Sequence, residues 1–329
     1  MSFNPAKLLL ALACLVPAGA RAQAVSAGAA EILPDQVDRM YLKGLDCLAR
    51  TQLPAGNWPD AGSGPAAIAG LAVVSLLAHG DDPNFGPYSQ TIHRGLDFLL
   101  KQQDQKTGYI GPSMYNHGFA TLALAESYGA VNDDRLGPAL RKAVQLILTS
   151  QAANPTKAWR YAPDARDADT TVTGAQMVAL LAARNAGVPV PEKNIQDGLR
   201  FYASCQTPDG GIGYISASGP GATRTAIGCV VMALAKAKDS TAFRSAFQYL
   251  KNAGNDPQYP AYFRYYASQA FFHGSNEAWN NWNHDNVNTL RASQTADGSW
   301  HGQFGQTFET AGSLLSLALN YRYLPIYER

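Results

Sequence analysis

The sequence predicts an all-α protein whose mature part is a closed α/α toroid of six helical hairpins, an α6/α6 barrel. A glutamine followed by a glycine and an aromatic residue recurs along the chain, and such self-similarity indicates a repeat architecture. Between the copies, one-sided amphipathic stretches alternate with stretches that are apolar on all sides. The alternating runs of Val, Ile and Thr that are typical of strands are absent from the sequence.

The first 22 residues are typical of a signal peptide. Lys7 precedes an apolar run from Leu8 to Val16, and this run is about half the roughly 20 residues that a membrane-spanning helix needs. We therefore expect removal of residues 1–22, export to the periplasm or beyond, and no transmembrane span in the mature chain. Residues 23–35 are expected to form a linker and residues 36–329 the toroid.

Composition restricts the partners and the metal chemistry. The chain has 46% hydrophobic residues, enough for a large core, and 26 Lys and Arg against 25 Asp and Glu. This balance argues against a nucleic-acid partner recruited by bulk charge. Cys14 lies in the predicted signal peptide, and Cys47, Cys205 and Cys229 are far apart. We expect three buried thiols, with one disulfide and one remaining thiol as the alternative.

The repeated motif marks the order of the helices. Its glutamines are Gln52, Gln103, Gln151, Gln206 and Gln294, and the long last interval indicates a sixth, degenerate copy near residues 250–254. The helix before each copy is amphipathic and therefore predicted to be outer, near 36–52, 87–103, 134–151, 191–206, 240–253 and 277–294. The apolar helix after each copy is predicted to be inner, near 64–79, 114–130, 169–186, 222–237, 258–272 and 307–321.

The last inner helix decides between a ring and an open α-solenoid. A solenoid needs polar capping units at its ends. The stretch from Thr310 to Leu319 is as apolar as the middle helices, so it needs neighbours on both flanks. Closure onto the first hairpin supplies that neighbour, which favours the ring. Trp279 and Trp282 either close the ring against the first hairpin or present aromatic faces to a sugar or lipid.

The unit from Gln294 to Trp300 resembles the Q-W repeat of squalene and oxidosqualene cyclases, and it is similar to the repeat of protein prenyltransferase β subunits. The resemblance extends over residues 36–329 and implies that each glutamine caps its turn and ties neighbouring outer helices. Together with the signal peptide, the Tyr115 helix start and the terminal stretch Arg322 to Tyr327, it resembles the single-domain prenyltransferase and squalene oxidase repeat proteins exported by bacteria. An isoprenoid or other apolar ligand is then expected.

A second resemblance concerns chemistry. Asp167-Ala168-Asp169-Thr170 resembles part of the Asp-x-Asp-Asp motif of class II terpene cyclases, whose middle aspartate protonates an alkene. It implies Asp169 as the acid and Asp167 as its partner, with Thr170 in place of the last family aspartate. The alternative is that Asp169 caps the helix that follows, because unpaired amides and the helix dipole favour aspartate there.

The zinc site of prenyltransferases is not reproduced. Ile227 and Glu309 stand where that family has an aspartate and a histidine, and Cys229 alone does not make a zinc site. We expect no metal and no other cofactor. Acid chemistry of the cyclase type is thus favoured over zinc-dependent prenyl transfer, if the protein is an enzyme.

The starts of the inner helices should meet at one mouth of the toroid. The residues predicted to contact a ligand there are Tyr115, His117, Thr170, Thr171, Arg224, Tyr262 and Glu309. His117 has the alternative of a hydrogen-bonded structural residue.

Three functions stay open. The first is a terpenoid-cyclase-like protein that holds an apolar ligand, which predicts an apolar, aromatic-lined cavity. The second is a noncatalytic binding or scaffold ring for a protein, lipid or glycan, which predicts a filled axis. The third is an α/α-barrel enzyme acting on polysaccharides, which predicts a long polar cleft with paired acids.

Overall fold

The computed structural model describes residues 35–59, 62 and 64–327, so the predicted signal peptide lies outside the described residues. The described part contains helices and no β-strand, only isolated β-bridges. The outer helices are α1 (Asp35–Thr51), α3 (Ser89–Gln102), α5 (Leu136–Ala153), α7 (Glu192–Ser204), α9 (Thr241–Ala253) and α11 (Asn276–Ser293). The inner helices are α2 (Pro65–Leu77), α4 (Met114–Ser127), α6 (Thr170–Asn185), α8 (Ala222–Leu234), α10 (Pro260–Gly274) and α12 (Gln306–Ala318).

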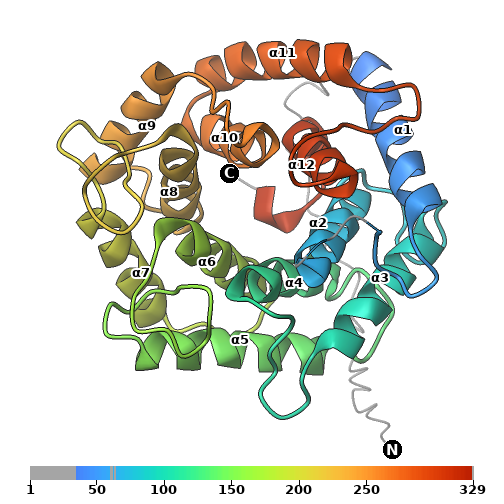
Figure 1. The fold of residues 1–329 in the computed structure, drawn as a ribbon, viewed down its shortest axis with the longest axis horizontal. Coiled ribbons are helices and arrows are strands. Elements are labelled where there is room, and N and C mark those ends of the chain that lie inside the picture. The colour runs from blue at the N-terminus through green and yellow to red at the C-terminus, as the bar shows by residue number, and fades with distance from the viewer. Residues whose placement is uncertain (1–34, 60–61, 63, 328–329) are drawn as a thin grey trace, which may run out of the picture. The chain divides into compact units, whose positions relative to one another are not determined.

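The helices form two concentric rings, as predicted (Figure 1). Each inner helix packs against the inner helix before it and the one after it, and α12 packs against α2. This last contact closes the ring, so the open solenoid is wrong. Within the described residues, no helix has the length and apolarity needed to cross a membrane.

The tryptophans of α11 do not make the closure. Trp279 packs edge-on against Phe272, and Trp282 stacks on Phe271, so both contact α10, the inner helix of the preceding hairpin. The junction is made instead by α1, whose Arg50 donates to the carbonyl of Asp297, and by the packing of α1 on α12. The prediction that the Trp279 segment closes the ring against the first hairpin is therefore wrong.

The glutamines tie the outer ring together. The amide of Gln294 donates to the carbonyl of Gly298 in its own turn, at 2.9 Å, and to the carbonyl of Met40 at 2.8 Å. The other four glutamines repeat this arrangement, each bonding its own turn and the first part of the next outer helix: Gln52, Gln103, Gln151 and Gln206. Because Gln294 reaches α1, the tie of the last copy also closes the ring.

The motif needs a glycine because its turn approaches the next outer helix closely. Gly298 has a φ of +89°, and a Cβ there would lie 2.2 Å from the carbonyl oxygen of Lys43. Gly108 has a φ of +79°, and its Cβ would lie 2.5 Å from the carbonyl oxygen of Lys142. Only glycine combines this backbone conformation with this approach.

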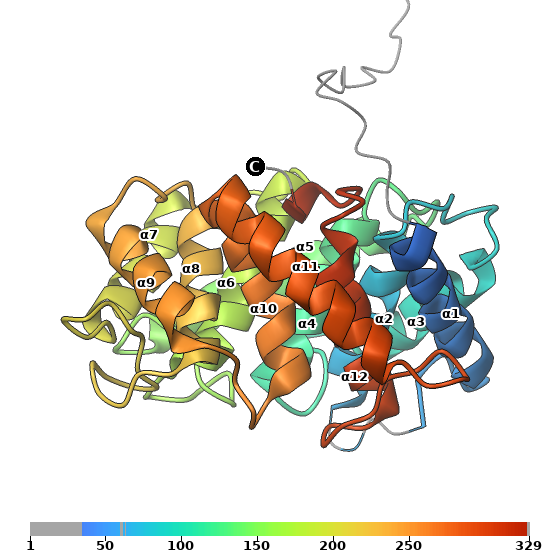
Figure 2. The ribbon, with the colours of Figure 1, turned by 90° about the horizontal axis from the view of Figure 1, so that it is seen from above.

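The axis of the ring is filled at mid-height and at one end. Phe119 of α4 and Tyr265 of α10, on opposite inner helices, have ring centroids 6.3 Å apart. Beyond them, the short 3₁₀ helix η1 (Pro325–Tyr327) occupies the centre of the ring (Figures 1 and 2). Its side chains Ile326 and Tyr327 are buried. The axial space is therefore open at the end where the inner helices begin.

The prediction of three buried thiols is confirmed, and the alternative of one disulfide is not. Cys47, Cys205 and Cys229 are all buried, and no disulfide joins them in the described part of the chain. They serve as small apolar core residues.

Candidate functional site

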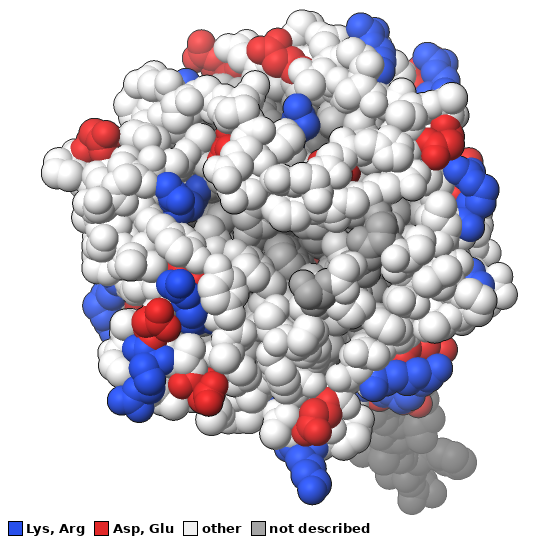
Figure 3. All heavy atoms as spheres, viewed as in Figure 1, with Lys and Arg blue, Asp and Glu red and all other residues white. Residues whose placement is uncertain are grey.

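A cavity of 1260 Å³ lies at the end of the ring where the inner helices begin. The space-filling view of this face shows a central hollow, with most charged side chains toward the periphery (Figure 3). Every inner helix contributes to the wall, because the six inner helices point the same way along the axis and their first turns lie at the same end. The expectation that residues far apart in the sequence converge at one mouth is met.

The described wall is rich in aromatic side chains and poor in charge. Its charged members are Arg224 and Asp256. Its aromatic members are Tyr115, Phe119, Tyr161, Tyr214, Tyr249, Tyr259, Tyr262, Phe304 and Phe308. Such a surface suits a ligand with much apolar area and few polar groups.

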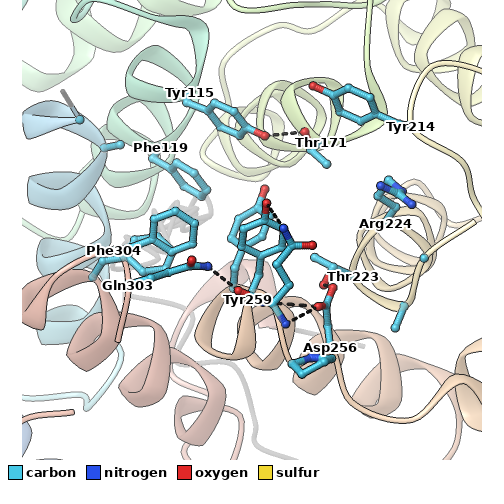
Figure 4. A pocket seen from close by; sticks show the side chains of 18 of the residues that line it. Tyr115, Phe119, Thr171, Tyr214, Thr223, Arg224, Asp256, Tyr259, Gln303 and Phe304 are labelled. Carbon is cyan, nitrogen blue, oxygen red and sulfur yellow. Dashed lines mark hydrogen bonds between the residues drawn. The ribbon is translucent and has the colours of Figure 1, made fainter. Parts of the chain in front are cut away.

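Four of the residues predicted to contact a ligand are on this wall: Tyr115, Thr171, Arg224 and Tyr262. The Tyr115 hydroxyl donates to Thr171 Oγ1 across the gap between α4 and α6 (Figure 4). Burial, and then the charge of Asp169, raise the pKa of Tyr115. Burial, and then the neighbouring Tyr115, raise the pKa of Tyr262 well above its ordinary value. Both phenols therefore stay protonated and act as neutral polar groups.

Asp169 lies behind the wall and caps α6. Its Oδ1 accepts hydrogen bonds from the amides of Thr171, at 2.9 Å, and Val172, at 2.8 Å, and from Thr171 Oγ1 at 2.6 Å. Its side chain is fully buried and is not among the described residues that line the cavity. Burial raises the pKa of the Asp169 carboxyl, while these hydrogen bonds and Arg160 lower it. These contacts are those of the capping alternative.

The two predicted catalytic carboxylates share a cation. Arg160 Nε lies 3.5 Å from Asp169 Oδ2, and Arg160 Nη1 lies 3.6 Å from Asp167 Oδ2. The guanidinium also lies over the rings of Tyr161 and Tyr214, 5.1 and 5.2 Å from their centroids. Asp167 is largely exposed, so the pair is an ion-paired cluster beside the mouth rather than two carboxyls facing the cavity.

Three of the residues predicted to bind a ligand are placed elsewhere, which corrects those predictions. His117 is fully buried; its Nδ1 accepts from the amide of Ile110 and its Nε2 lies 3.0 Å from the carbonyl of Ala143. Burial lowers the pKa of His117 to about 4, so it is a neutral structural residue. Thr170 donates to the carbonyl of Gly213 inside the protein. Glu309 is buried against Gly302, behind the loop that precedes α12.

Several wall residues were not predicted from the sequence. Phe119 lies one turn after Tyr115, and this spacing would have placed it on the same face. Tyr259 and Phe304 lie in loops and stack on each other, with centroids 5.7 Å apart. No pattern in the sequence indicates that these two loops meet.

The described residues offer no evident metal centre. No three His, Cys, Asp or Glu side chains among them lie close enough to hold an ion. Cys229 is buried within α8, where burial raises its thiol pKa, so it is a core residue there.

No protein-family model matches the chain, and no curated protein matches it in sequence. A type II terpene cyclase from Scytonema, with geranylgeranyl dihydroxybenzoate bound, has a TM-score of 0.58 and 17% identity over 88% of this chain and 99% of that chain. An α-1,6-mannanase from Salegentibacter sp., with α-1,6-mannotetrose bound, has a TM-score of 0.65 and 9% identity over 88% and 99%. The shared feature is the α/α toroid. At these identities the likeness shows the fold alone.

Proposed function

We propose that the protein binds an apolar small molecule of the isoprenoid class in the cavity where the inner helices begin. The observation that carries the proposal is the described wall, in which nine aromatic side chains accompany a single acid and a single base. Burying an apolar chain against such a wall contributes roughly 25 cal/mol for each Å² removed from water. A cavity of 1260 Å³ has room for a ligand of that size class.

The alternatives have weaker support. Glycoside hydrolysis ordinarily uses two carboxyl groups on either side of the scissile bond, whereas Asp256 is the one carboxylate on the described wall. A scaffold ring needs no cavity, and here the axis is filled only beyond the aromatic layer of Phe119 and Tyr265. The cyclase with a bound isoprenoid substrate supports the same choice by analogy of fold.

Catalysis by Asp169 is not part of the proposal. Its Oδ1 caps the first turn of α6, its Oδ2 lies 3.5 Å from Arg160 Nε without a hydrogen bond, and the side chain does not line the described cavity. Binding therefore has direct structural support, while proton transfer from Asp169 to a ligand does not.

We propose further that the protein is an exported, single-domain member of the prenyltransferase and squalene oxidase repeat proteins. The five glutamine ties and the single toroid support the family assignment, and the first 22 residues of the sequence support export. N-terminal sequencing of the protein from its native host tests cleavage after residue 22, and an intact Met1 would contradict it.

Binding of geranylgeraniol, measured by isothermal titration calorimetry, tests the main proposal. We expect geranylgeraniol to bind and mannotetraose not to bind. Phe308→Ala removes an aromatic group of the wall, so it should weaken binding roughly 10-fold, in line with the 1–2 kcal/mol lost with part of a ring contact. Phe85→Ala is the matched control, because Phe85 is 85% exposed and outside the wall. Binding of mannotetraose alone would overturn the proposal.

A further inference from the structure

We propose that the ligand carries one carboxylate head group, which Arg224 binds, and that its apolar chain extends from α8 toward the aromatic side of the cavity. This inference rests on the proposed function and specifies the class of ligand. It is carried by the contacts of Arg224, by the state of Asp256 and by the arrangement of polar and aromatic groups around the axis.

Arg224 is a cation without a counterion among the described residues. It is the one Lys or Arg on the described wall, and it makes no ion pair with a described carboxylate. Its Nη2 donates to the carbonyl of Gly219 at 2.6 Å, while its Nε is buried and has no hydrogen-bond partner. A buried donor left unpaired costs free energy, and an anionic ligand would supply the missing acceptor.

The guanidinium is held in place before any ligand binds. A Cβ on Gly221 would lie 2.8 Å from Arg224 Nη2, so the side chain lies against the backbone of the loop that leads into α8. Together with the hydrogen bond to Gly219, this contact fixes the planar group at the wall. A fixed guanidinium binds a carboxylate through two parallel hydrogen bonds at little further entropic cost.

Asp256 makes no ion pair with Arg224, and both of its carboxylate oxygens accept hydrogen bonds from α8 and from its own loop. Oδ2 accepts from Thr223 Oγ1 at 2.6 Å, and Oδ1 accepts from the amide of Gln258 at 3.0 Å. The wall therefore holds one carboxylate whose oxygens are hydrogen-bonded, Asp256, and one guanidinium with an unpaired donor, Arg224. A ligand with a single negative charge matches this arrangement, whereas a diphosphate would bring excess negative charge close to Asp256.

The phenylalanines of the wall lie across the axis from Arg224, whereas Tyr214 lies beside it. In the order of inner helices around the ring, α8 is opposite α2, and the neighbours of α2 are α4 and α12. Phe119 of α4 and Phe304, just before α12, lie on the far side of the cavity from Arg224 (Figure 4). Phe308 of α12 adds to the same aromatic side. An amphiphile with its head at α8 would place its chain on these rings.

Three ligands with the same 20-carbon chain test the inference by calorimetry: geranylgeranoic acid, geranylgeraniol and geranylgeranyl diphosphate. We expect wild-type protein to bind the carboxylate roughly 10-fold or more tightly than the alcohol, as for a hydrogen-bonded charge pair. Arg224→Gln should bring the affinity for the carboxylate down to about that of the alcohol, and it should lower the affinity for the alcohol far less. Arg141→Gln, on the exposed face of α5, is the matched control and should change neither.

The outcomes separate the head group from the proposed function. If the alcohol and the carboxylate bind equally, or if Arg224→Gln affects both alike, the carboxylate inference is overturned and the apolar-ligand proposal stands. Tightest binding of the diphosphate would overturn the choice of a singly charged head. If none of the three binds to wild-type protein, the proposed function is wrong, and the inference about its head group with it.

Discussion

His117 and Asp169 illustrate how polar residues at the starts of inner helices contribute to the structure. Asp169 precedes the first turn of α6, and His117 lies in the first turn of α4. Both ring nitrogens of His117 and Oδ1 of Asp169 contact protein groups, while Asp169 Oδ2 is buried without a hydrogen-bond partner. The Asp169 carboxylate caps α6, and the His117 ring joins the backbone of Ile110 to that of Ala143. The sequence left helix capping by Asp169 and a structural role for His117 as alternatives to functional roles, because position in the sequence shows that a residue lies near the mouth but not which way its side chain points.

His117 should make stability depend on pH. Its pKa is about 4 in the folded protein, below the ordinary 6.5, so the unfolded chain binds the proton first as the pH falls. The stabilising contribution is complete above pH 6.5 and is lost as the pH falls toward 4. We expect the free energy of unfolding to drop by about 2 kcal/mol between pH 7 and pH 5 from this residue. Urea unfolding at the two pH values measures it.

His284, an exposed histidine, provides the control for this effect. His117→Gln should remove most of the pH-dependent loss, whereas His284→Gln should leave it unchanged because the His284 side chain is 76% exposed. Equal pH dependence in the wild-type protein and in His117→Gln would contradict the neutral, buried role of this ring.

Sequence position likewise predicted only part of the cavity wall. Tyr115, Thr171, Arg224 and Tyr262 could be predicted because each lies in the first turns of an inner helix, whose direction the repeat fixes. Phe304 could not, because it lies in a loop whose path depends on stacking with another loop.

Helices are the elements that the sequence predicts best. The alternation of amphipathic and uniformly apolar stretches placed all twelve helices to within a few residues, because the burial pattern of a helix follows from its position in the ring. The glutamine ties could be expected from the resemblance to Q-W repeats, and five are present. The degenerate copy near residues 250–254 lacks the glutamine.

The tie of Gln294 should contribute as much to stability as a tie in the middle of the chain. Gln294→Ala leaves the carbonyls of Met40 and Gly298 without this donor, and we expect a loss of roughly 1–3 kcal/mol in the free energy of unfolding. Gln103→Ala is the matched variant, since Gln103 bonds Gly108 and Ala139 in the same way. Chemical denaturation of both variants should give similar losses. A negligible loss for Gln294→Ala beside a clear one for Gln103→Ala would indicate an open array.

At the scale of the described ring, closure was predictable and the filling of the axis was not. Closure follows from the apolar flanks of the first and last inner helices. The position of η1 in the centre of the ring depends on a short segment with Leu324, Ile326 and Tyr327, which has too few residues for a periodic pattern. The consequence for function is that the ring offers a large cavity at one end and a smaller one, of 510 Å³, at the other.

Hydrogen exchange with and without saturating geranylgeraniol tests the central claim, that the ring binds an apolar ligand where its inner helices begin. We expect slower amide exchange at residues 113–119, 259–263 and 304–308, which border the large cavity, and no change at residues 321–327. Slower exchange confined to residues 321–327 and the ends of α2, α4 and α6 would place the ligand in the smaller cavity. That result, or unchanged exchange throughout at a concentration where calorimetry shows binding, would contradict the account.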